Sequence, residues 1–183
     1  ISSSNTLTTY PVSGITDPGG LQSASLIEDD NSGGSKEVWW GYEDVDPNSD
    51  TNPYQFSIFA KPSGVDYLYF SASFGNSGSE QWFNLANSTT GSSAGPSPSN
   101  LDGVFQVQDF QNGWKRVGVQ YNKFGTNTGN MIVGISDTDG GKTVTADGTA
   151  KMYLWGVNSA RPNTVINVGG RLAEFTYGAV EAG

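Results

Sequence analysis

Residues 54–74 read Tyr54-Gln-Phe-Ser-Ile-Phe-Ala-Lys-Pro-Ser-Gly-Val-Asp-Tyr-Leu-Tyr-Phe-Ser-Ala-Ser-Phe74, and this stretch decides the fold class. Apolar residues occupy every second position in each half, first at 54, 56, 58 and 60 and then at 68, 70, 72 and 74. Such alternation is typical of β-strands that bury one face. Only Phe59 breaks it. The turn sequence Pro62-Ser63-Gly64 lies between the halves, so the stretch predicts a β-hairpin in the middle of a sheet.

Short segments of similar character flank this stretch, separated by turns that are rich in Gly, Pro, Asn and Asp. The expected strands are residues 21–28, 37–43, 80–86, 104–110, 114–121, 130–136, 151–157, 164–168 and 172–177. No segment of ten or more residues keeps a helical period. Ten to twelve short strands without substantial helix predict an all-β fold, with two antiparallel sheets packed as a jelly-roll sandwich.

The chain has 183 residues, which is enough for one domain with a sizeable core. Residues 1–20 are polar and contain several Pro and Gly residues, so we expect an extended N-terminal arm or cover strand there. Residues 21–183 are expected to form a single jelly-roll domain. Residues 87–100 are rich in Ser, Thr, Gly and Pro and are expected to form a long loop that is either mobile or functional.

Composition excludes several classes of chemistry. The chain contains no Cys and no His, so it has no disulfide, no thiolate metal site, no cysteine nucleophile and no Ser-His-Asp triad. A Glu-x-Asp-x-x-Glu arrangement, which glycosidases of this fold class commonly carry on one strand, is also absent. We therefore predict a protein that is not an enzyme and that needs no cofactor.

The charge and hydropathy of the chain exclude two kinds of partner. The net charge is −9 and no Lys/Arg cluster offsets it, so phosphate backbones would be repelled and no nucleic acid is expected to bind. No apolar run approaches the roughly 20 residues of a membrane helix, so no membrane partner is expected.

Four aromatic residues are candidates for carbohydrate binding. Trp39, Tyr67 and Tyr69 occupy strand positions opposite the apolar ones, and Trp82 lies near a polar loop. Aromatic rings on one sheet can stack on sugars, because the C–H groups of a pyranose meet the negative face of the ring. The alternative is that the second face is also covered and that these rings are packing residues. Arg116, near Trp114, could bind an acidic sugar or play a structural part.

Acidic residues in two loops are candidates for a structural Ca²⁺ site. Asp29 and Asp30 precede one turn, and Asp137 and Asp139 lie in another. Calcium takes carboxylate ligands of this kind together with backbone carbonyls. The alternative is that these residues form solvated acidic loops.

Four stretches, taken in order, resemble a known family. Residues 24–30 (Ala-Ser-Leu-Ile-Glu-Asp-Asp), 54–61 (Tyr-Gln-Phe-Ser-Ile-Phe-Ala-Lys), 112–119 (Asn-Gly-Trp-Lys-Arg-Val-Gly-Val) and 152–156 (Met-Tyr-Leu-Trp-Gly) are similar to strands of concanavalin A-like (laminin-G-like) jelly-roll modules. Such modules occur in tailed-phage structural proteins and as secreted carbohydrate-binding modules. The resemblance covers roughly residues 20–168. It departs after Trp155-Gly156, where Val157-Asn158-Ser159 replaces the usual Gln-Leu-Glu.

The resemblance implies a non-catalytic virion module, either a capsid decoration or a tail or fibre protein. Its partners would be other virion chains, with a homo-oligomer expected, and it could contact host glycans. The alternative is a carbohydrate-binding module from a secreted polysaccharide-degrading enzyme. The expected location is therefore the virion, or otherwise the extracellular medium.

Overall fold

A computed structural model of the chain describes residues 2–4, 6–42, 54–74, 77–95, 106–121 and 129–160. These residues form twelve strands in two sheets of six. Sheet A contains, in spatial order, β1 (Ser2–Ser4), β4 (Lys36–Tyr42), β11 (Gly129–Ser136), β6 (Tyr67–Phe74), β7 (Ser77–Asn84) and β8 (Thr89–Ala94). Sheet B contains β2 (Thr6–Thr9), β3 (Ser25–Asp29), β12 (Lys151–Ala160), β5 (Tyr54–Ser63), β10 (Lys115–Tyr121) and β9 (Gln106–Asp109).

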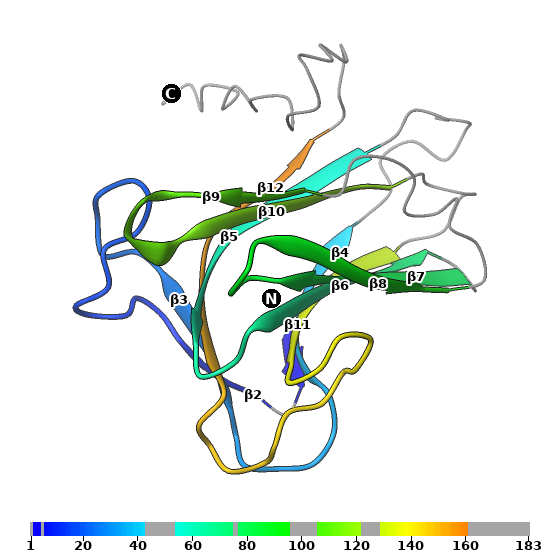
Figure 1. The fold of residues 1–183 in the computed structure, drawn as a ribbon, viewed down its shortest axis with the longest axis horizontal. Coiled ribbons are helices and arrows are strands. Elements are labelled where there is room, and N and C mark those ends of the chain that lie inside the picture. Colours follow the sequence, from blue (N-terminus) through cyan, green and yellow to red (C-terminus); the bar gives the residue numbers. More distant parts are fainter. Residues whose placement is uncertain are drawn as a thin grey trace.

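Neighbouring strands in both sheets are antiparallel, and the two sheets lie one above the other as layers (Figure 1). The helical structure within the described ranges is one 3-10 turn, η2 (Gln111–Gly113). None of these residues belongs to a helix that is long and apolar enough to span a membrane. The predicted all-β fold with two antiparallel sheets is thereby confirmed. The finer jelly-roll connectivity stays a prediction.

The core lies between the two sheets. Apolar side chains from both layers meet there and are almost fully buried; the largest contributors are Phe56, Ile58, Leu68, Phe70, Phe83, Val117, Val119, Met131, Val133, Ile135, Met152 and Leu154. Phe56 of sheet B contacts Phe70 of sheet A edge to face, with ring centroids 5.2 Å apart. The alternation of residues in the sequence therefore identifies the inward faces of β5 and β6 correctly.

The predicted hairpin at residues 54–74 is wrong. β5 lies in sheet B between β12 and β10, whereas β6 lies in sheet A between β11 and β7. The turn after Ser63 thus carries the chain from one sheet to the other. Gly64 makes this possible, because its φ is +96° and a Cβ there would lie 2.5 Å from the carbonyl oxygen of Thr149. Two strands that bury the same core from opposite sheets show the same alternation as a hairpin would.

The N-terminal residues contribute strands to both sheets of their own chain. β1 pairs with β4 and β2 pairs with β3, so the predicted arm is a pair of cover strands. The loop predicted for residues 87–100 is also wrong in part, because Thr89–Ala94 form the edge strand β8. The strands predicted at 164–168 and 172–177 lie outside the described residues.

Candidate functional site

A group of partly exposed rings lies on the outer face of sheet B, turned away from the core. Phe59 on β5 lies between Trp155 on β12 and Phe110, the residue after β9, with ring centroids 5.5 Å and 5.2 Å away. The guanidinium carbon of Arg116 on β10 lies 5.8 Å from the centroid of the Phe59 ring. We call these four residues the aromatic face. Phe110 is 44% exposed, and the other three are half-buried.

Strand register explains why these side chains meet. Phe59 is opposite Arg116 on one neighbouring strand and opposite Trp155 on the other. Residues that are directly opposite in antiparallel strands point to the same side of the sheet. Met152 and Leu154 point into the core, so Trp155 points outward. After Trp155 the register shifts at Gly156, whose φ of +61° suits a bulge that other residues would strain.

The segment before β3 fixes the orientation of Trp155. The indole nitrogen of Trp155 donates a hydrogen bond of 3.0 Å to the hydroxyl oxygen of Ser23. That hydroxyl donates in turn to the carboxylate of Asp17, which is almost completely buried. The same carboxylate also accepts hydrogen bonds from the backbone nitrogens of Gly19, Leu21 and Ser23. Burial opposes ionisation of Asp17, but these hydrogen bonds lower its pKa overall. The ionised carboxylate of Asp17, with both oxygens hydrogen-bonded, therefore holds the backbone of residues 17–23 in place next to Trp155.

The four aromatic residues predicted to bind carbohydrate do not form an exposed row. Tyr69 is 0% exposed and Trp82 is 1% exposed, so the prediction that they present ring faces to a sugar is wrong. Tyr67 is half-buried on the outer side of sheet A. Trp39 belongs to β4, opposite Ile132 in register, and its side chain lies outside the described part of the structure.

Polar contacts and a loop cover the outer side of sheet A at Tyr69 and Trp82. The Tyr69 hydroxyl donates a 2.7 Å hydrogen bond to Glu37, and the Trp82 indole nitrogen donates to the carbonyl of Gly141 in the loop after β11. Lys142 from the same loop binds Glu80. Burial and the bond to Glu37 raise the pKa of Tyr69 well above its usual value, so the phenol stays protonated. The alternative left open by the sequence, a covered second face, is the one found here.

Gly134 provides the space that the Tyr69 ring occupies. A Cβ at Gly134 would lie 2.2 Å from the Cζ atom of Tyr69. Because this ring is buried beside Trp82, it cannot turn away without disturbing that packing.

We expect Gly134→Ala to lower the free energy of unfolding by about 1–3 kcal/mol, measured by urea denaturation. Gly33→Ala is the matched control and should be nearly neutral, since nothing lies within 4 Å of its Cβ position. Equal stability of the two variants would contradict this account.

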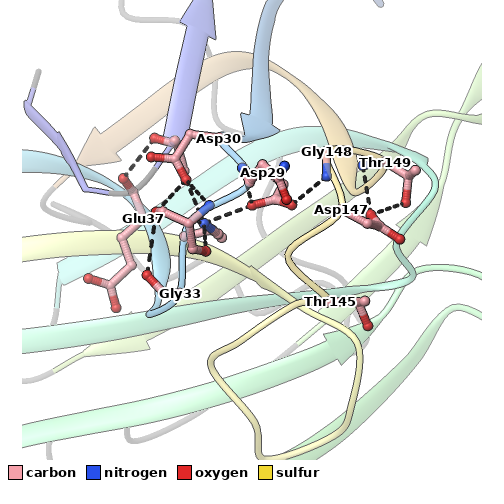
Figure 2. A network of polar contacts seen from close by, with 12 residues as sticks. Asp29, Asp30, Gly33, Glu37, Thr145, Asp147, Gly148 and Thr149 are labelled. Carbon is pink, nitrogen blue, oxygen red and sulfur yellow. Dashed lines mark hydrogen bonds and ion pairs between the residues drawn. The ribbon is translucent and has the colours of Figure 1, made fainter.

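The carboxylates of Asp29 and Asp30 bind a lysine. The ammonium nitrogen of Lys36 lies 2.7 Å from a carboxylate oxygen of each and donates to the carbonyl of Ser32. Figure 2 shows the two aspartates, with the bond that joins Gly148 to Asp29. Asp29 also accepts hydrogen bonds from the backbone nitrogens of Asn31 and Gly148. In this structure the ammonium group of Lys36 thus lies between Asp29 and Asp30, where a calcium ion was predicted, and the calcium site itself stays a prediction.

Asp137 and Asp139 each accept hydrogen bonds from a different segment of the chain. Asp137 accepts from the backbone nitrogen and hydroxyl of Thr145, at 2.7 and 3.0 Å. Asp139 accepts from the backbone nitrogen and hydroxyl of Ser92 on β8, at 2.7 and 2.9 Å. Within the described ranges, no three Asp, Glu, His or Cys side chains gather where they could hold a metal ion. These aspartates therefore act as caps for loop backbone.

The aromatic face was not predicted as a site, although two signals for it were present in the sequence. Phe59 is the one residue that interrupts the alternation in residues 54–61. A single exposed apolar ring is ordinary, but several rings gathered on the outward side of neighbouring strands can mark an interaction site. Trp155 likewise stands on the outward side of a strand whose inward residues, Met152 and Leu154, are apolar.

Comparison with known proteins adds no family. No protein-family model matches the chain, and no curated protein matches it. The resemblance to concanavalin A-like modules therefore stays a prediction, and the fold and the aromatic face are the features on which a function can be argued.

Proposed function

We propose that this chain is a non-catalytic carbohydrate-binding module that holds its ligand on the aromatic face. The observation that supports this is the adjacency of three partly exposed rings, Trp155, Phe59 and Phe110, on the outer side of one sheet. Pyranose C–H faces stack on such rings, and polar neighbours then set orientation. Arg116 and Gln108, which are opposite each other in register on β10 and β9, supply polar groups beside the rings.

Two settings for such a module follow from the sequence resemblance, a tailed-phage virion and a secreted polysaccharide-degrading enzyme. Strand exchange between subunits would favour an assembly role, but β1 and β2 pair with strands of their own chain. This pairing within the chain favours a binding role over an assembly role. In the virion setting, the same face would contact host glycans.

Replacing Phe110 by Ala should weaken glycan binding by about tenfold or more while leaving the fold intact. A stacked ring that loses about 1.4 kcal/mol of contact energy changes the dissociation constant tenfold. Because the Phe110 ring is 44% exposed, its removal should cost less than about 1 kcal/mol of stability. The measurement is a screen of polysaccharides by affinity electrophoresis, followed by titration calorimetry on those that bind.

Tyr67→Ala is the matched control, since Tyr67 is a half-buried aromatic residue on the outer side of the other sheet. It should bind glycans as the unmodified protein does. If Tyr67→Ala abolished binding while Phe110→Ala did not, the site would lie on sheet A. If no polysaccharide bound at all, the proposed function would be wrong.

A further inference from the structure

We infer that the ligand of the aromatic face is a carboxylated polysaccharide, one built from uronic acid residues. This inference rests on the proposed carbohydrate-binding function and adds the chemical class of the sugar. It is carried by two cationic side chains, Arg116 and Lys61, that share the outer face of sheet B with the rings.

Arg116 lies within the row of rings. It is opposite Phe59 in register, and its guanidinium carbon is 5.8 Å from the centroid of that ring. Contact with the ring limits the orientations open to the guanidinium group. A planar guanidinium matches the two oxygens of a carboxylate, with two parallel hydrogen bonds, better than it matches a neutral hydroxyl group.

Lys61 lies two residues after Phe59 on β5 and therefore points to the same side of the sheet. It is opposite Tyr153 in register, and its Cε atom is 3.8 Å from the Cβ position of Gly113, in the turn between β9 and β10. Arg116 and Lys61 thus flank Phe59, one on the adjacent strand and one further along the same strand.

Lys61 differs from the other lysines that the structure describes. Lys36, Lys115, Lys142 and Lys151 each form an ion pair with an aspartate or glutamate. No carboxylate of the described residues lies within ion-pair distance of Lys61. In a chain with a net charge of −9, a lysine that has no such partner among the described residues and lies beside partly exposed rings is a place where a ligand could supply the missing anion.

Three acidic residues of the described structure lie on or next to the strands of this face, and each is already bound within the protein. Glu28 pairs with Lys151, and Asp109 pairs with Lys115. Asp17, beneath the turn at Gly19, has both oxygens occupied by hydrogen bonds. Among the described residues, Arg116 and Lys61 are therefore the cationic groups beside Phe59, whereas Asp17 keeps its negative charge at the Trp155 edge of the face.

The overall negative charge does not prevent binding of an acidic polysaccharide. At an ionic strength of about 0.15 M the screening length is about 8 Å, so exposed carboxylates farther away contribute little. Groups in direct contact with the ligand are screened much less. The net charge should slow association at low salt, whereas contacts with Arg116 and Lys61 should decide affinity and ligand choice.

The experiment compares each acidic polysaccharide with its own neutral ester. The first pair of probes is polygalacturonate and its methyl ester, and the second pair is alginate and its propylene glycol ester. Dextran sulfate is a third probe, which carries sulfate groups in place of carboxylates. Titration calorimetry with the whole chain should give an affinity for at least one of the two acids about tenfold or more above that for its ester. Lys61→Met and Arg116→Gln should each remove most of this preference, whereas Phe110→Ala should weaken binding of acid and ester alike.

Lys142→Met is the matched control, because it removes the same charge from the loop that covers sheet A and should leave the preference unchanged. Lys61→Met keeps the test valid if Arg116→Gln proves unstable. Equal affinity for acid and ester, or tighter binding of dextran sulfate than of either acid, would overturn the inference while leaving the carbohydrate-binding function standing. If none of the unmodified or modified polysaccharides bound, the proposed function would fail as well.

Discussion

Phe56→Ala is expected to lower the free energy of unfolding by about 3–5 kcal/mol. The Phe56 side chain is 0% exposed and packs edge to face on Phe70 across the two sheets. Phe70 in turn packs edge to face on Phe83, with ring centroids 5.5 Å apart. Removing the first ring leaves a cavity that backbones held in two six-stranded sheets cannot close. Urea denaturation of both proteins measures the difference.

Phe59→Ala is the matched control for this prediction. It changes the same residue type in the same strand, but the Phe59 ring is half-buried on the outer side of sheet B. Because solvent can reach the vacated space, we expect the stability loss to be less than half of that for Phe56→Ala. Equal losses would mean that the outer face of sheet B is packed like the core, and the aromatic face would then not be available to a ligand.

Lys36→Met is the second change with a large expected effect, a loss of about 3–5 kcal/mol. The side chains of Lys36 and Asp29 are both 0% exposed, so the variant would leave a buried carboxylate without its cation. This network also joins the end of β3 to the segment before β12, through the bond from the Gly148 nitrogen to Asp29. The same substitution at Lys61 is the control and should change stability by less than about 0.5 kcal/mol.

A triple variant separates loss of the ion pair from loss of the lysine's own packing. Lys36→Met combined with Asp29→Asn and Asp30→Asn removes the cation together with both negative charges. Since replacing a whole buried ion pair is often close to neutral, this variant should recover much of the stability lost in Lys36→Met alone. If the triple variant were as unstable as Lys36→Met, the uncompensated charge would not be the cause.

The pH dependence of stability provides a further check on the same network. Burial opposes ionisation of Asp29, but hydrogen bonds from Lys36, Gly148 and Asn31 lower its pKa, and bonds from Lys36 and Ser32 lower the pKa of Asp30 to about 2. A lowered pKa contributes stability above the unfolded value of about 3.9 and loses it as pH falls toward the folded value. The unmodified protein should therefore lose stability between about pH 4 and pH 2. The difference from Lys36→Met should shrink over that range, because acid neutralises the carboxylates that the variant leaves uncompensated.

The alternation of apolar and polar residues predicted most of the strands and which of their side chains point into the core. Alternation identified Phe56, Ile58, Leu68 and Phe70 as core residues, and all four are buried. It could not show that β5 and β6 belong to different sheets, because both sheets bury their inward side chains in one core. Nor could it place Thr89–Ala94 in a strand, since the Ser and Thr residues there also suit a loop.

Burial of the outward-pointing residues depends on contacts between distant segments. Tyr69 and Trp82 stand at outward positions, and the loop after β11 buries them through the bond from the Trp82 indole to the carbonyl of Gly141. Phe59 and Trp155 also stand at outward positions and stay half-buried, and the segment before β3 contacts Trp155 through Ser23. The sequence therefore could not show that Tyr69 and Trp82 would be covered while Phe59 and Trp155 would stay partly exposed.

For this protein, the sequence by itself determined the all-β class, the inward residues of the strands with clear alternation, such as β5 and β6, and the absence of histidine and cysteine chemistry. These follow from residue type and from the two-residue period of a strand, which are local properties. The tertiary structure decided which strands share a sheet, which outward face is covered, and which carboxylates bind Lys36. Each of these depends on pairing between segments far apart in the chain, such as Trp82 with Gly141 and Asp29 with Gly148, and no local period records such pairings.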